Sequence, residues 1–94
     1  MEGEIMIKEE KTLSLEAIKF LIEKVYAAQQ AGNHVVFTYG NSSISILTMV
    51  GEFNTEKEWF GQFHIFISSH KEQKANYDKC IAHLEILAGE KHDN

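Results

Sequence analysis

The chain has 94 residues, of which 44% are apolar and 24% charged, a balance typical of one small globular domain over residues 1–94. All nine basic residues are lysine and the formal net charge is −5, which disfavours nucleic acid as a partner because phosphate binding needs clustered cations. The lack of arginine also disfavours base-specific readout, since the planar guanidinium makes the bidentate contacts to guanine.

The first predicted helix covers residues 13–31 and follows a charged lead, residues 1–11. Thr12 or Ser14 is placed to cap the start of the helix, and Gly32 is placed to end it. An apolar stripe recurs at three- and four-residue spacing, formed by Ile18, Leu21, Ile22 and Val25. We expect this stripe to face the core.

Three predicted strands follow, rich in β-branched and aromatic residues. The first covers 34–39 and is joined to the second, 44–53, by the turn residues of 40–43. A polar connection over 54–58 leads to the third strand, 59–67. These short connections favour hairpins.

The second predicted helix covers about 70–88, and Ser69 with Glu72 forms a capping-box pattern at its start. Gly89 is placed to end it, and we expect the tail 90–94 to be frayed. Its apolar stripe consists of Tyr77, Cys80, Ile81, Leu84 and Leu87.

The order α-β-β-β-α predicts an α+β fold, a two-layer sandwich. The short connections between the strands permit an antiparallel meander but not parallel crossovers. Both helices then cover one face of the three-stranded sheet and leave the other face open.

The open face of the predicted sheet is the strongest functional signal. Side chains alternate across a strand, so every second residue points away from the helices. The outward set is too apolar for a solvated surface, and large apolar patches usually mark interaction sites. We therefore predict a protein–protein interface, either in a homodimer or with a foreign protein, at Val36, Leu47, Met49, Phe60, Gln62, His64 and Phe66.

Two alternatives would explain these apolar residues without a protein–protein interface. The charged lead or the tail could fold over it, or a shift of one residue in strand register could exchange the two faces. If the open face is instead part of the core, Phe66→Asp should unfold the protein rather than disrupt association.

No pattern in the chain predicts catalysis, a cofactor or a metal site. His34 and His64 would share a sheet face but lie two strands apart, about 9.6 Å, too far for a comfortable zinc pair. Cys80 and His83 are three residues apart on a helix, but Cys80 falls on the apolar stripe, where a thiol is usually inert. We expect a non-enzymatic protein.

A second hypothesis is a small acidic inhibitor that occupies the basic site of a nucleic-acid-handling enzyme, as some phage anti-defence proteins do. The candidate surface is the acidic loop between the second and third strands, with Glu52, Glu56 and Glu58. A solvated acidic loop would carry the same residues, so composition permits this function without favouring it.

A third hypothesis rests on a resemblance. The α-β-β-β-α order, with the stretch Ser69-His70-Lys71-Glu72-Gln73-Lys74-Ala75, resembles the double-stranded RNA-binding domain at the start of its second helix. The resemblance implies that Lys71 and Lys74 would contact phosphates across the major groove. The chain departs from that family in its negative charge and its lack of arginine.

The expected location is the cytoplasm. Cys80 is the only cysteine, which excludes an internal disulfide and a cysteine zinc cluster. The first eleven residues lack the basic start of a signal peptide, and no apolar run approaches the roughly 18 residues of a membrane span.

Overall fold

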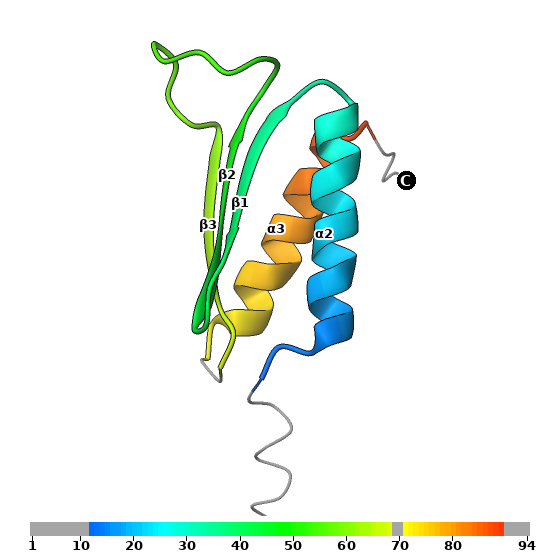
Figure 1. Cartoon of the computed structure of the whole chain (residues 1–94), viewed down its shortest axis with the longest axis vertical. Helices are drawn as coiled ribbons and strands as arrows, with labels where there is room; N and C mark the ends of the chain where they lie inside the picture. The colour runs from blue at the N-terminus through cyan, green and yellow to red at the C-terminus, as the bar shows by residue number, and fades with distance from the viewer. Residues whose placement is uncertain (1–11, 69–70, 90–94) are drawn as a thin grey trace, which may run out of the picture.

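The structure is a computed structural model that describes residues 12–68 and 71–89. In chain order it contains α2 (Leu15–Gln30), β1 (His34–Tyr39), β2 (Ser43–Met49), β3 (Gly61–Phe66) and α3 (Gln73–Leu87). The strands form one antiparallel sheet in the order β1-β2-β3, and the two helices lie side by side against one face of it (Figure 1). The predicted α+β fold is confirmed.

Helix α2 lies within the predicted range of 13–31, and the predicted Ser14 and Gly32 flank its two ends. The Ser14 hydroxyl caps the helix by accepting a hydrogen bond from the Ala17 N–H at 3.0 Å. Gly32 follows the end of the helix with a φ of +100°, a conformation that suits glycine. The buried stripe continues to Ala28, and Ile22 lies outside it with 46% of its surface exposed.

The core lies between the sheet and the helices. Across the sheet, Phe37 pairs with Ile46, which pairs with Phe63, and all three share the helix-covered face. Burial of each large apolar side chain contributes about 1.5–3 kcal/mol. The largest fully buried apolar side chains from sheet and helices are Ile44, Ile46, Ile65, Leu21, Cys80 and Leu84.

Helix α3 begins at Gln73, later than predicted, and the Ser69 of the expected capping box lies outside the described residues. Its N-cap residue is Glu72, which makes no side-chain capping bond. The Gln73 side-chain amide instead donates to the carbonyl oxygens of Phe66 at 2.7 Å and Ile67 at 3.0 Å. The start of the helix is thus held by the end of β3.

The connection between β2 and β3 is longer than predicted, because β2 ends at Met49 and β3 begins only at Gly61. Gly51 leaves the extended conformation with a φ of +75°. The Lys57 ammonium then donates to the Val50 carbonyl oxygen at 2.9 Å, which closes the segment into a loop. We call residues 50–60 the long loop; it extends beyond the end of the sheet (Figure 1).

Polar contacts tie the two helices to each other. Lys24 on α2 pairs with Glu85 on α3 at 2.8 Å, and the Tyr77 hydroxyl donates to the Ala17 carbonyl at 2.7 Å.

Within the described ranges, neither helix is long and apolar enough to cross a membrane.

Candidate interaction surfaces

The side of the sheet away from the helices presents five of the seven residues predicted for it: Val36, Leu47, Gln62, His64 and Phe66. Val36, Leu47 and Gln62 lie side by side across the three strands, as do Thr38, Ser45 and His64 in the next row. Phe66 pairs with Ser43, and its ring meets the His64 ring edge-on at 5.0 Å between centroids. We use the name open face for Val36, Ser45, Leu47, Gln62, His64 and Phe66.

The open face carries no acidic side chain and no lysine, although the chain contains 14 acidic residues and nine lysines. Val36, Leu47 and Phe66 are half-buried, so each still presents part of its apolar surface to solvent. A shallow hollow of about 280 Å³ lies on this side, lined by Ser45, Leu47, Gln62, Phe63 and His64. The face is therefore partly apolar, lacks acidic side chains and lysine, and is not flat.

Two residues predicted for this surface, Met49 and Phe60, are not exposed on it. Met49 points away from the helices, but only 2% of its surface is exposed because the long loop folds over it. Phe60 precedes β3, so the alternation of side chains along that strand does not determine which way it points. Its ring contacts His83 of α3 at 5.2 Å between centroids, on the helix side of the sheet.

Each edge strand of the sheet has a carbonyl that accepts a hydrogen bond from a side-chain amide of a helix. Gln29 of α2 donates to the Val35 carbonyl of edge strand β1 at 3.0 Å. Asn76 of α3 donates to the His64 carbonyl of edge strand β3 at 3.3 Å. Such covering is one way in which proteins discourage the addition of a further strand.

The long loop is folded by aromatic contacts. The His34 ring of β1 lies 5.0 Å from the Phe53 ring and 6.0 Å from the Trp59 ring, between centroids. Phe53 and Trp59 also meet at 6.1 Å. This cluster explains why His34 is half-buried rather than available beside His64.

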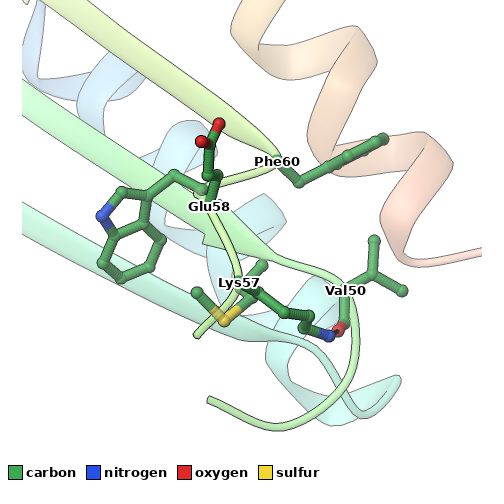
Figure 2. Close-up of a pocket in the computed structure, with 6 residues that line it drawn as sticks. Val50, Lys57, Glu58 and Phe60 are labelled. Carbon is green, nitrogen blue, oxygen red and sulfur yellow. Dashed lines mark hydrogen bonds between the residues drawn. The ribbon is translucent and has the colours of Figure 1, made fainter. Parts of the chain in front are cut away.

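A pocket of about 300 Å³ opens between the long loop and the end of β2 (Figure 2). We call it the loop pocket; it is lined by Met49, Val50, Lys57, Glu58, Trp59 and Phe60. The predicted acidic residues Glu52, Glu56 and Glu58 all lie on this loop and are exposed, and Glu58 is part of the pocket wall. The sequence signalled the charge but not the pocket.

A buried polar pair that sequence reasoning did not find lies between sheet and helix. The Thr48 hydroxyl is fully buried and hydrogen-bonds the His83 Nε2 at 2.8 Å. Burial lowers the pKa of His83 below its usual 6.5 and so favours the neutral imidazole. Gly61 makes room for this pair, since a Cβ there would lie 2.6 Å from His83 Nε2 and 2.8 Å from Thr48 Oγ1.

The geometry offers little to nucleophilic or metal chemistry. The Cys80 thiol is fully buried, and desolvation raises its pKa to about 12, which suppresses the reactive thiolate. His83 is engaged with Thr48. Among residues 12–68 and 71–89, no three histidine, cysteine, aspartate or glutamate side chains are grouped to hold a metal ion.

The lysines implicated by the RNA-binding resemblance lie at the start of α3. The Lys74 ammonium pairs with the Asp78 carboxylate at 2.9 Å, which offsets its charge. Lys71 is exposed in the turn before the helix.

Comparison of the chain with known proteins gave no lead on function. No family model and no curated protein matches the sequence, and no solved structure matches the fold.

Proposed function

We propose that this protein is a non-enzymatic interaction module whose open face binds the open face of a second copy. The observation that carries the proposal is an uncharged, partly apolar sheet face on a molecule with a net charge of −5. Two such molecules repel each other at long range, and the open face is a surface on which they can meet without opposing carboxylates.

The sheet edges support a face-to-face arrangement rather than strand addition. The carbonyls of Val35 and His64 are already bonded to helix amides, so a second strand that paired at these positions would have to displace Gln29 or Asn76. Two antiparallel sheets stacked about 10 Å apart would instead interdigitate their side chains. Leu47 and Phe66 would then be shielded from water.

The size of the face sets the expected strength. Strands of six or seven residues in a three-stranded sheet give a footprint of about 20 by 14 Å. Stable interfaces bury about 800 Å² on each partner, which is well above this footprint. We therefore expect weak, reversible dimers.

We also place the protein in the cytoplasm, where its single cysteine would stay reduced.

The variant Leu47→Asp tests the proposal. It places a carboxylate in the middle row of the open face, where the dimer would have to desolvate it at a cost of several kcal/mol. We expect Leu47→Asp, and likewise the separate variant Phe66→Asp, to keep the circular dichroism spectrum of the wild type. Both should stay monomeric in sedimentation equilibrium.

Ile22→Asp is the matched control, because Ile22 is a partly exposed apolar residue on α2, away from the sheet. It should dimerise like the wild type. If Leu47→Asp dimerises as well as the control does, or if both open-face variants unfold, the open face is not the interface.

A further inference from the structure

The loop pocket is the second surface of the molecule that combines apolar side chains with a defined hollow. Its floor is the buried Met49, and its rim includes Val50 and Phe60, which are 48% and 60% exposed. Figure 2 shows Val50 and Phe60 projecting from the chain around the pocket. Apolar side chains that are exposed together around one hollow are typical of contact sites.

The pocket has the size and character to hold one side chain rather than a cofactor. At about 300 Å³ it lies at the lower limit of small-molecule sites. Met49 supplies a flexible, polarisable floor that adapts to irregular apolar shapes. Trp59 and Phe60 supply aromatic walls, and aromatic residues are enriched at the centres of binding surfaces.

The charge of the long loop selects the kind of partner. Residues 50–60 contain three glutamates and one lysine, so the loop carries a net charge of −2. The Lys57 ammonium is held by the Val50 carbonyl at 2.9 Å. Glu52, Glu56 and Glu58 are exposed, and the structure shows none of the three in an ion pair with another described residue. A basic surface would be attracted to this rim, whereas a second copy of the loop would be repelled.

We propose that the loop pocket binds one apolar side chain, such as leucine, presented by a lysine- or arginine-rich segment of a foreign protein. The apolar residue would fill the pocket between Val50 and Phe60, and the flanking cations would lie beside Glu56 and Glu58. This site is separate from the open face and does not depend on dimerisation.

Trp59 provides the measurement, because it lines the pocket and is the only tryptophan in the chain. The probe is a synthetic peptide with one leucine flanked on each side by two lysines. We expect it to change the Trp59 fluorescence in a saturable, salt-sensitive way. A peptide with serine in place of leucine should bind at least about tenfold more weakly, since it lacks the apolar anchor.

Two protein variants test whether peptide binding depends on the charge of the long loop. Glu56→Lys combined with Glu58→Lys changes only exposed side chains and should weaken peptide binding about tenfold or more. Leu47→Asp on the open face should bind the peptide like the wild type. The proposal is overturned if fluorescence shows no saturable change, if the serine peptide binds as tightly as the leucine peptide, or if the double charge reversal has no effect.

Discussion

At the scale of single residues, the contact between Thr48, Gly61 and His83 determines how closely α3 packs on the sheet. A threonine on the covered face of β2 needs a hydrogen-bond partner once it is buried, because an unpaired buried hydroxyl costs about 1–3 kcal/mol. His83 supplies that partner only because residue 61 has no Cβ. The three residues are distant in sequence, so no local pattern could reveal their contact.

The same pair makes stability depend on pH. Burial lowers the pKa of His83 in the folded state, so below pH 6.5 the unfolded chain binds a proton that the folded chain resists. The free energy of unfolding should therefore fall as the pH falls from 6.5 towards the folded-state pKa of His83, and this loss should be absent above pH 7. Urea unfolding at a series of pH values from 7.5 to 5 measures it.

The comparison variant is His83→Gln, which keeps a hydrogen-bonding group near Thr48 but does not titrate in this range. Its stability should vary less with pH than that of the wild type. Equal slopes for the two proteins would show that His83 is not the source.

At the scale of elements, the sequence predicted the helices and the strand pairing well because each is determined by local periodicity. The alternation in 34–39 and the hydroxyl of Ser14 are short-range signals, and both were confirmed. The ends of β2 and β3 were wrong because they depend on distant contacts. His34 of β1 holds Phe53 and Trp59, and this cluster shapes the long loop.

The candidate site follows the same division. Val36, Leu47 and Gln62 were correctly placed on one face, since strand alternation is a local signal. The sequence left the strand register open, and only the observed pairing defines it. Met49 and Phe60 were misplaced because the loop that covers one and redirects the other was not predicted. The pocket between them could not be foreseen for the same reason.

Asn33 connects three elements through one side chain. Its amide nitrogen donates to the Ala28 carbonyl at 3.2 Å and the Leu87 carbonyl at 2.8 Å, and its oxygen accepts from the Gly51 N–H at 3.1 Å. Asn33→Ala should lower the free energy of unfolding by about 1–3 kcal/mol, because half-buried backbone groups lose their partners. Chemical denaturation measures the change.

The control for this prediction is Asn41→Ala, which alters an exposed asparagine in the turn between β1 and β2. It should change stability by less than about 0.5 kcal/mol. If Asn33→Ala unfolds at the same denaturant concentration as Asn41→Ala, the side chain of Asn33 does not hold α2, α3 and the long loop together.

At the scale of the whole molecule, the two-layer arrangement leaves one sheet face uncovered by the helices and places the long loop at one end of the same sheet (Figure 1). The loop pocket lies between this loop and the end of β2. The two surfaces differ in charge. The open face is neutral and suits a second copy, whereas the long loop is acidic and suits a basic partner. In our account, one chain could therefore dimerise and bind a foreign protein at the same time.

The most direct test is the solution mass of the wild-type protein by light scattering over a wide range of concentrations. Weak self-association through the open face predicts a mass near 10.7 kDa when dilute, rising towards twice that value at high concentration. Leu47→Asp should remain at 10.7 kDa throughout. A wild-type mass that stays at 10.7 kDa up to the highest concentration would contradict the account.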